Sequence, residues 1–259
     1  MQTLFLLIIG LAAGVLSGLF GIGGGVLIVP GLILIAGFSL VQATGTSLAA
    51  ILLPVGLLGV LVFHKARIID LRASLLIATG LMSTVAVGAW LANALPGDLM
   101  KRLYGAFLLY VSWRFIKPVD IIRGLRGRVP VSRPEPEEIP RPSAVVLLGV
   151  GLAAGVLSGL FGIGGGNIIV PVLTAFLGYP AKRAIATSLG ALLPPIGLPG
   201  VILYHHAGSL DLLTAVPVAA GLFLGTVVGA RFNIQLPGKT IKLLYGLFLL
   251  FVALRFIAG

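Results

Sequence analysis

The sequence predicts an all-α, polytopic integral membrane protein made of two inverted-topology repeats. Three observations support this prediction. Hydrophobic residues make up 58% of the 259 positions, whereas charged residues make up only 10%. A glycine-rich sequence at Gly10 to Gly25 is repeated letter for letter at Gly151 to Gly166. Finally, most of the Lys and Arg residues fall on one side of the predicted membrane-spanning segments.

The composition excludes most other classes of protein. A soluble globular chain carries about a quarter charged residues, and the 18 Lys and Arg and 7 Asp and Glu of this chain cannot cover an aqueous surface. High hydrophobicity excludes disorder, and the absence of cysteine excludes a disulfide scaffold. In a membrane protein, a net charge of +11 marks cytoplasmic loops. We therefore expect a lipid bilayer as partner and no nucleic acid.

The repeat divides the chain into two halves. The offset between Gly10 and Gly151 continues without a gap to Ile116 and Ile257. It also pairs Pro30 with Pro171, His64 with His205, and Asp70 with Asp211. We assign residues 1–117 to a first membrane repeat, 118–143 to a cytoplasmic linker rich in Pro, Arg and Glu, and 144–259 to a second membrane repeat. The apolar start, Met1 to Leu19, recurs in mid-chain and lacks a charged n-region, so we interpret it as part of the fold.

Each half contains about five apolar helical segments, which gives about ten in total. They lie near 2–20, 25–37, 43–63, 71–94 and 98–116, with counterparts near 144–161, 166–178, 184–204, 212–235 and 239–257. A helix needs about 20 residues to cross the bilayer, so three segments in each half are long enough. The second segment is too short to span and is predicted to be a half-helix. Pro54 and Pro194-Pro195 predict kinks in the third segments. Whether the first two segments span or re-enter stays open.

The charge distribution predicts that the two halves have opposite orientations. Whether the first two segments both span or both re-enter, each half crosses the membrane an odd number of times. The second half therefore starts on the opposite side from the first and should be inverted. A cytoplasmic linker places fifteen basic residues on its own side and three on the other. The three are Lys101, Arg102 and Arg255. Both termini are then expected outside. Inverted repeats are typical of secondary transporters, whose substrate site lies where the halves meet.

The two glycine-rich segments are the first candidates for a substrate site. Glycine costs about 1 kcal/mol relative to alanine inside a helix, so we interpret these segments as helix breaks. Irregular backbone at membrane depth is tolerated inside protein or along a cavity. Helices that start there with their amino-terminal ends inward would offer N–H groups to an anion. The alternative is that the glycines serve close helix packing alone, as at Gly14 and Gly18. The candidate backbone donors are Gly21, Gly23, Gly24, Gly25, Gly162, Gly164, Gly165 and Gly166.

Several polar side chains near the breaks are further candidates. Asn167 replaces Val26 of the first half and adds an amide donor, although it could instead pair across helices. Four hydroxyls could either cap a helix start or donate to an anion; they belong to Thr46, Ser47, Thr187 and Ser188. Arg183, the counterpart of Gln42, could attract anions from the cytoplasm, although topology alone would also explain its charge. No acidic residues or cysteines cluster with the histidines, so we expect no metal and no cofactor.

These motifs resemble one family of membrane transporters. The duplicated GLFGIGGG(V/N)-x-I-V-P motif, the paired Gly45-Thr46-Ser47-Leu48 and Ala186-Thr187-Ser188-Leu189, the length and the basic linker are similar to those of the sulfite exporter TauE/SafE family. The resemblance covers nearly the whole chain. It implies transport of sulfite, sulfoacetate or another organosulfonate, typically outward across the bacterial inner membrane.

We therefore expect a secondary transporter that exports a small sulfur-containing anion by alternating access. A passive anion channel, or a carrier for another small carboxylate or oxyanion, is the alternative. An enzyme is not expected, because the sequence offers no acid pair, no cysteine and no facing His/Ser/Asp set. The particular anion, the direction of transport, proton coupling and the oligomeric state, including a homodimer, stay open at this point.

Overall fold

The computed structural model describes residues 2–20, 23–52, 57–65, 67–116, 142–210, 212–233, 247 and 249–256. Gly21, Pro54, Asp211 and nearly all of the predicted linker lie outside these residues. The chain forms two compact units. The first contains Met1–Leu95 and Glu138–Gln235, and the second contains Pro96–Glu137 and Leu236–Gly259. Each unit therefore takes residues from both sequence repeats.

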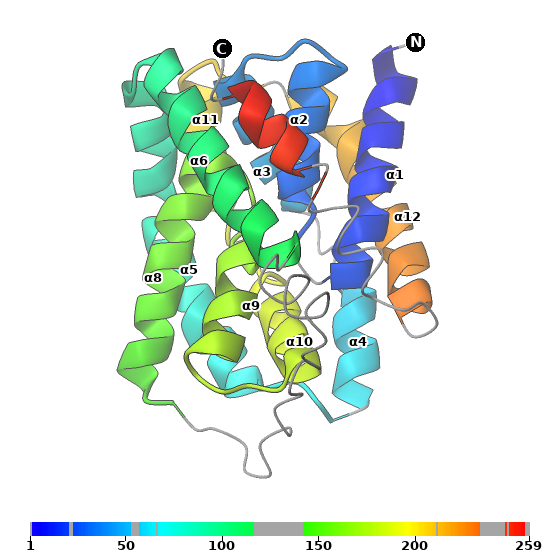
Figure 1. The fold of residues 1–259 in the computed structure, drawn as a ribbon, viewed down its shortest axis with the longest axis vertical. Helices are drawn as coiled ribbons and strands as arrows, with labels where there is room; N and C mark the ends of the chain where they lie inside the picture. Colours follow the sequence, from blue (N-terminus) through cyan, green and yellow to red (C-terminus); the bar gives the residue numbers. More distant parts are fainter. Residues whose placement is uncertain are drawn as a thin grey trace, which may run out of the picture. The chain divides into compact units, whose positions relative to one another are not determined.

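In the described part of the first unit, every regular element of secondary structure is a helix. Four helices of 18 to 24 residues frame it: α1 (Gln2–Phe20), α5 (Leu71–Ala94), α8 (Ala144–Phe161) and α12 (Leu212–Asn233). Six short helices complete it: α2 (Gly25–Leu34), α3 (Leu40–Ile51), α4 (Leu57–Lys65), α9 (Gly166–Ala175), α10 (Ala181–Ala191) and α11 (Leu198–His206). Figure 1 shows the long helices around the short ones. The predicted all-helical class is confirmed.

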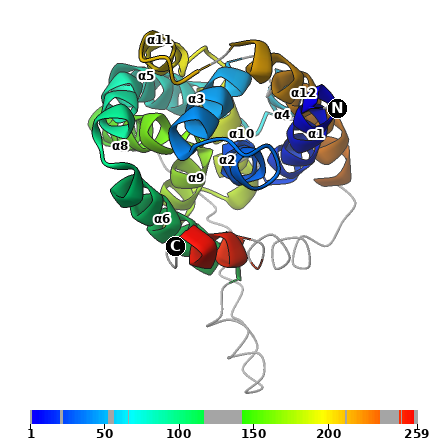
Figure 2. The same ribbon diagram turned by 90° about the horizontal axis from the view of Figure 1, so that it is seen from above.

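The long helices pack in two close, parallel pairs, α1 with α12 and α5 with α8 (Figure 2). Glycines make the contact close: a Cβ added to Gly221 or Gly225 would collide with the backbone of Leu7 or Leu11. The predicted close packing at small residues is therefore present, and it involves more glycines than the predicted Gly14 and Gly18. Direct backbone contact maximises dispersion attraction where lipid removes the hydrophobic drive for helix association.

The two pairs are equivalent under the sequence repeat. The sequence repeat pairs α1 with α8 and α5 with α12. In each close pair, the first helix of one half therefore packs against the fourth predicted segment of the other half. In Figure 1, α1 runs downward from the N-terminus, whereas α8 runs upward. The two sequence halves are thus interleaved in the first unit.

Helices α2, α3, α9 and α10 lie between the two pairs, whereas α11 lies at the edge beside α5 (Figure 2). The prediction of a short second segment is confirmed by α2 and α9, which have 10 residues each. The third segments differ from the expected kinked helices, because each is divided into two short helices. In the second half, α10 ends at Ala191 and α11 begins at Leu198. Pro194 and Pro195 lie in this gap, where two consecutive missing N–H groups break the helical ladder rather than bend it.

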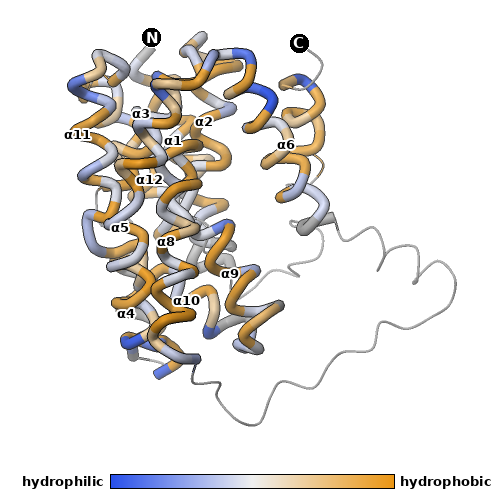
Figure 3. The backbone as a smooth tube through the Cα atoms, turned by 90° about the vertical axis from the view of Figure 1, so that its left-hand side faces the viewer, coloured by the Kyte–Doolittle hydropathy of each residue, from blue (hydrophilic) through white to orange (hydrophobic). Residues whose placement is uncertain are grey.

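The outer faces of the long helices are apolar. Leu75 and Trp90 on α5, Val145 on α8 and Leu213 on α12 each expose more than half of their surface. Figure 3 shows hydrophobic residues along the helices and hydrophilic ones at the ends of α4, α10 and α11. Three described helices, α5, α8 and α12, are long and apolar enough to cross a membrane. Apolar side chains outside and glycines inside are expected of a multi-pass membrane protein.

The second unit contains α6 (Gly97–Ile116) and helical residues at 247 and 249–256. Tyr104 on α6 packs edge to face against Phe256, with ring centroids 5.5 Å apart. Edge-to-face contact places the positive ring edge of one aromatic against the negative face of the other. This contact joins residues from the ends of both sequence repeats.

Candidate substrate site

The two glycine-rich breaks meet inside the first unit. Gly25, the first residue of α2, lies so close to Gly162 and Ile163 that an added Cβ would collide with their backbone. Gly23 lies near the same segment, because its Cβ would come within 3.6 Å of the Ile163 carbonyl oxygen. The structure thus brings together two predicted site segments that are more than 130 residues apart in sequence. Gly21, another predicted site residue, lies outside the described residues.

Both breaks end in the same kind of helix start. Gly24 precedes α2 with φ 75°, and Gly165 precedes α9 with φ 79°. These are left-handed conformations that glycine adopts without a steric penalty. The carbonyl oxygen of Gly24 accepts from Leu27 and Ile28, and that of Gly165 accepts from Ile168 and Ile169. The N–H groups ahead of these bonds are among those that a helix leaves without an intrahelical partner, and they form the positive end of its dipole.

One predicted backbone donor is already engaged. The Gly162 N–H donates to the Ser158 carbonyl oxygen at 2.8 Å and closes the last turn of α8. Gly162 also accepts a 2.6 Å hydrogen bond from Ser47. Gly162 therefore holds the break in shape. Of the second glycine segment, Gly164, Gly165 and Gly166 remain as candidate donors.

Asn167 is the most distinctive polar side chain at the breaks. It is the second residue of α9 and only 3% exposed. Neither its amide nitrogen nor its amide oxygen has a hydrogen-bond partner within the part of the chain that the structure describes. Leaving a buried polar group unsatisfied costs about 1–3 kcal/mol. Within the described residues, the amide is therefore a group that can still accept and donate hydrogen bonds.

Two hydroxyls share this property with Asn167. Ser158 on α8 and Ser188 on α10 are fully buried, and neither hydroxyl has a partner among the described residues. Helices α8 and α10 both contact α9, which carries Asn167. Ser188 was predicted from the sequence, whereas Ser158 was missed because Gly155, Ser158 and Gly159 resemble an ordinary helix-packing stripe. Three partnerless polar groups thus come from three neighbouring helices.

The predicted cap role of the hydroxyls at Thr46, Ser47, Thr187 and Ser188 is wrong. Helix α3 begins at Leu40, and its cap is Ser39, which exchanges hydrogen bonds with Gln42. Helix α10 begins at Ala181 after Pro180. The four hydroxyl residues therefore lie inside the two helices. There, the Ser47 hydroxyl donates to Gly162, and the Thr187 hydroxyl accepts from the Asp70 N–H.

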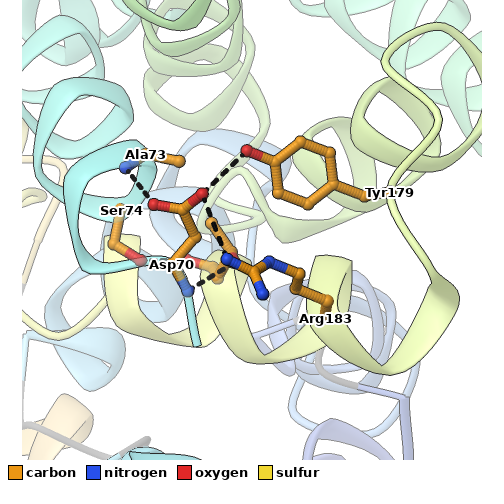
Figure 4. Close-up of polar contacts among 6 residues, drawn as sticks. Asp70, Ala73, Ser74, Tyr179 and Arg183 are labelled. Atoms are coloured by element: carbon orange, nitrogen blue, oxygen red, sulfur yellow. Dashed lines mark hydrogen bonds and ion pairs between the residues drawn. The ribbon is translucent and has the colours of Figure 1, made fainter. Parts of the chain in front are cut away.

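A polar cluster lies where the α4–α5 connection meets α9 and α10 (Figure 4). The Asp70 carboxylate accepts a 3.0 Å hydrogen bond from the Tyr179 hydroxyl and lies 3.6 Å from Arg183 Nη2. The Asp70 N–H donates to the Thr187 hydroxyl at 3.2 Å, and the Ser74 hydroxyl donates to the Thr187 carbonyl oxygen at 2.9 Å. We call these five residues the second mouth. They tie the start of α5 to α10.

The second mouth is largely shielded from solvent. The side chains of Arg183 and Asp70 are 19% and 20% exposed. Burial and the neighbouring Asp70 carboxylate raise the pKa of Tyr179, so the hydroxyl stays protonated and keeps donating. Arg183 was predicted to steer anions. Its charge faces Asp70 at this mouth, which reduces the field that it projects into solvent.

A hollow is lined by residues of α3, of α12 and of the α2–α3 and α11–α12 connections. Figure 1 shows these two connections at the end of the first unit opposite to the α4–α5 connection. The hollow has a volume of about 260 Å³ and is lined by Phe38, Gln42, Thr46, Gly208, Ser209, Leu210 and Thr214. We call this lining the first mouth. Thr46, a predicted site residue, therefore lies at this mouth, whereas its counterpart Thr187 lies at the second.

The sequence analysis missed the roles of Asp70 and Tyr179. Asp70 directly precedes an apolar segment and resembles an ordinary residue at a helix start, and Tyr179 belongs to none of the motifs. One signal was available: Tyr179 replaces Phe38, just as Arg183 replaces Gln42. Two polar replacements four positions apart, both in the second half, indicate an interaction that only the second half makes.

Comparison with known proteins decides the family. A match to the family described as "Sulfite exporter TauE/SafE" covers residues 6–256. The chain belongs to the sulfite exporter TauE/SafE family. The resemblance expected from the glycine motifs is confirmed. No solved structure matches this family member.

Relatives of this TauE/SafE protein support the same class. It is 28% identical to the probable membrane transporter protein YunE of Bacillus subtilis, over 99% of this chain and 98% of the relative. It is 30% identical to a probable membrane transporter protein of Methanocaldococcus jannaschii, over 92% of this chain and 89% of the relative. A probable membrane transporter protein of Haemophilus influenzae is 29% identical over 97% of both chains. Family and relatives together support a multi-pass membrane transporter.

Proposed function

We propose that this protein exports a small sulfur-containing anion, such as sulfite, sulfoacetate or another organosulfonate, by alternating access. The observation that carries the proposal is the buried amide of Asn167 in the first turn of α9, which has no hydrogen-bond partner among the described residues and lies where the two glycine breaks meet. The amide N–H₂ and the first N–H groups of α2 and α9 are all neutral donors. Such donors suit an anion, because they need no buried cation.

The family description supports the sulfur oxyanion as the substrate class. Sulfite and sulfonates carry three oxygens that accept hydrogen bonds from several directions. The side-chain candidates Asn167, Ser158 and Ser188 come from three different helices. They could therefore donate to more than one oxygen of the same ion.

Alternating access is favoured over a passive channel by the difference between the two ends. The first mouth is hollow, whereas the second is filled by its own polar side chains. A channel needs both ends open at once. The opposite directions of α1 and α8 in Figure 1 also support two inverted halves around one central site.

The basic residues favour an orientation for the proposed transporter. Lys65 and Arg67, near the second mouth on the α4–α5 connection, belong to the fifteen expected in the cytoplasm. Arg183, also at that mouth, belongs to the same group. The second mouth then faces the cytoplasm, and the first mouth and both termini face outside.

The experiment is sulfite flux in proteoliposomes, with and without a pH gradient. The test variant is Asn167→Val, which reproduces the residue of the first half at the equivalent position and so suits the local backbone. We expect saturable flux and counterflow in the parent, and a several-fold rise in KM for sulfite in Asn167→Val. Thr79→Ala, on an exposed position of α5, is the control and should transport normally.

Three results would contradict the proposal. Absence of sulfite, sulfoacetate and taurine flux in vesicles that contain folded protein would remove the substrate class. Linear, non-saturating flux without counterflow would favour the channel. An unchanged KM in Asn167→Val would remove Asn167 from the site.

A further inference from the structure

The two mouths are built from equivalent positions of the two halves. The repeat pairs Phe38 with Tyr179, Gln42 with Arg183, and Thr46 with Thr187. On the facing connections it pairs Thr214 with Ala73, and Ser209-Leu210 with Ile68-Ile69. The same part of the fold therefore occurs twice in the first unit, once hollow and once filled.

At the first mouth, the side chains of Thr46 and Gln42 can donate to a ligand. Thr46 is 1% exposed as a residue and lines the hollow, and no hydrogen bond joins its hydroxyl to any residue that the structure describes. The Gln42 side-chain oxygen accepts from the Ser39 N–H at 3.1 Å. This bond orients the amide and leaves its N–H₂ group as a donor at the hollow. A buried hydroxyl and an amide thus face about 260 Å³ of space.

At the second mouth, the equivalent groups are occupied by Asp70. Its carboxylate accepts a hydrogen bond from the Tyr179 hydroxyl and pairs with Arg183, while its N–H donates to the Thr187 hydroxyl (Figure 4). A guanidinium and a hydroxyl are the groups that recognise carboxylates, sulfonates and similar oxyanions in proteins. The Asp70 carboxylate therefore has the surroundings of a bound anion.

We propose that the two mouths are equivalent oxyanion-binding sites on the transport path, and that Asp70 occupies the second mouth as an internal carboxylate that the substrate must displace. This inference rests on the proposed function, because it takes the transported oxyanion as the ligand. Displacement frees Arg183, Tyr179 and Thr187 to bind the ion and releases the start of α5 from α10. Binding at the cytoplasmic mouth and opening of that mouth are thus one event.

The two mouths differ in the side chains that stand beside the carboxylate position, and the carboxylate of the first half, Asp211, lies outside the described residues. Asp211 is the counterpart of Asp70, so both halves carry the carboxylate. In the first half, however, Phe38 has no hydroxyl and Gln42 has no charge. The second half alone therefore combines a carboxylate with a charged and a hydroxyl partner, which favours the filled state at its own mouth.

The test uses cysteine accessibility, because the chain contains no cysteine and a single introduced thiol is the only one present. Thr46→Cys and Thr187→Cys place a thiol at equivalent positions of the two mouths. The probe is a negatively charged methanethiosulfonate reagent, applied to the full-length protein in detergent so that both mouths are reachable. We expect Thr46→Cys to react about tenfold faster than Thr187→Cys. The ion pair between Asp70 and Arg183 favours the closed second mouth, and a free-energy difference of about 1.4 kcal/mol lowers the open fraction about tenfold.

Removal of the internal carboxylate should then open the second mouth. Asp70→Asn keeps a side chain that can cap α5 but removes the charge that holds Arg183. We expect it to raise the labelling rate of Thr187→Cys several-fold and to leave that of Thr46→Cys unchanged. Arg183→Gln, which reproduces the first-half residue, should have the same effect. It replaces Asp70→Asn in this test if Asp70→Asn does not fold. Unchanged labelling of Thr187→Cys in both backgrounds would overturn the inference.

Sulfite then tests the ligand. In the Asp70→Asn background, sulfite should slow the labelling of Thr187→Cys, whereas in the parent background the same concentration should protect Thr46→Cys alone. Flux of sulfite through the parent, measured in proteoliposomes made from the same purified protein, separates the two proposals. Intact flux without protection at either mouth overturns this inference and leaves the proposed function standing. Absence of both flux and protection overturns both.

Discussion

The Ser47 hydroxyl donates a 2.6 Å hydrogen bond to the Gly162 carbonyl oxygen, across 115 positions of sequence. Ser47 lies inside α3 of the first half, and Gly162 closes α8 of the second half. The bond fixes the place where the glycine break of the second half begins. Its counterpart residue Ser188 has no partner for its hydroxyl within the described chain. The residue equivalent to the acceptor, Gly21, lies outside the described residues.

Ser47→Ala should destabilise the protein. The substitution leaves the buried Gly162 carbonyl without this donor, and the loss of one such bond costs about 1 kcal/mol. Thermal unfolding in detergent measures the effect. Ser83→Ala removes a hydroxyl of an exposed residue on α5 that bonds only its own helix, and it should change stability by less than half as much. Equal effects of the two variants would contradict a special role for Ser47.

Ser188→Ala should have the opposite profile. The Ser188 hydroxyl is buried without a partner among the residues that the structure describes, so its removal relieves a desolvation penalty and should leave the melting temperature unchanged or slightly raised. If the hydroxyl donates to the substrate, KM for sulfite rises several-fold at the same time. Flux assays and thermal unfolding on one preparation separate the two effects. A fall in stability with an unchanged KM would assign Ser188 to the fold alone.

Gly88→Ala should loosen the α5–α8 pair. An added Cβ would collide with the Val156 carbonyl oxygen, so the two helices would have to separate. We expect a loss of about 1–3 kcal/mol, as for other overpacked positions. Gly149→Ala on α8 meets nothing within 4 Å and should be neutral or slightly stabilising, because alanine favours the helix. Similar melting temperatures for both variants would contradict the close packing of this pair.

The double variant Phe38→Tyr/Gln42→Arg should fill the first mouth. It gives the first half the hydroxyl and the charge that Tyr179 and Arg183 provide in the second, next to the sequence position of Asp211. Labelling of Thr46→Cys should then slow about tenfold, and transport should slow because both mouths favour closure. Phe38→Tyr alone adds no charge and should have a smaller effect. Fast labelling in the double variant would show that these two positions do not control the mouth.

Tyr179 should resist ionisation at high pH. Burial first, and then the charge and hydrogen bond of Asp70, raise its pKa above the ordinary value of about 10. Because the folded state favours the protonated phenol, the stabilisation is present below pH 10 and is lost only as the pH rises through the folded-state pKa. The ultraviolet difference between the parent and Tyr179→Phe should contain no tyrosinate signal near pH 10. A tyrosinate midpoint near 10 would contradict the contact with Asp70.

Much of the fold follows from local sequence. Apolar runs bounded by polar ends predicted the helical segments, and the short α2 and α9 follow from runs too short to span a bilayer. The glycine breaks follow from helix propensity. The division of the third segments into two helices was underestimated, because a single proline usually bends a helix and the combined effect of Pro194, Pro195 and Gly197 exceeds a bend.

The candidate site was only partly predictable. Asn167 stood out because the repeat offers its own comparison at Val26. The difference between Thr46 and Thr187 did not, since both stand in the same Thr-Ser-Leu motif and only their partners differ. Asp70 resembled an ordinary residue at a helix start, and it does cap α5, but its second carboxylate oxygen binds residues that are more than 100 positions away.

The sequence by itself determined that this is a helical membrane protein with two related halves and two glycine breaks, because composition, repetition and helix propensity are properties of short segments. Only the tertiary structure decided that α1 pairs with α12, that the breaks touch at Gly25 and Gly162, and that Asp70 fills one mouth while the other stays hollow. Those features depend on contacts between distant segments. In a repeated chain, each segment could pack against a given segment or against its counterpart in the other half. The total free energy of the packed structure decides which of the two contacts forms.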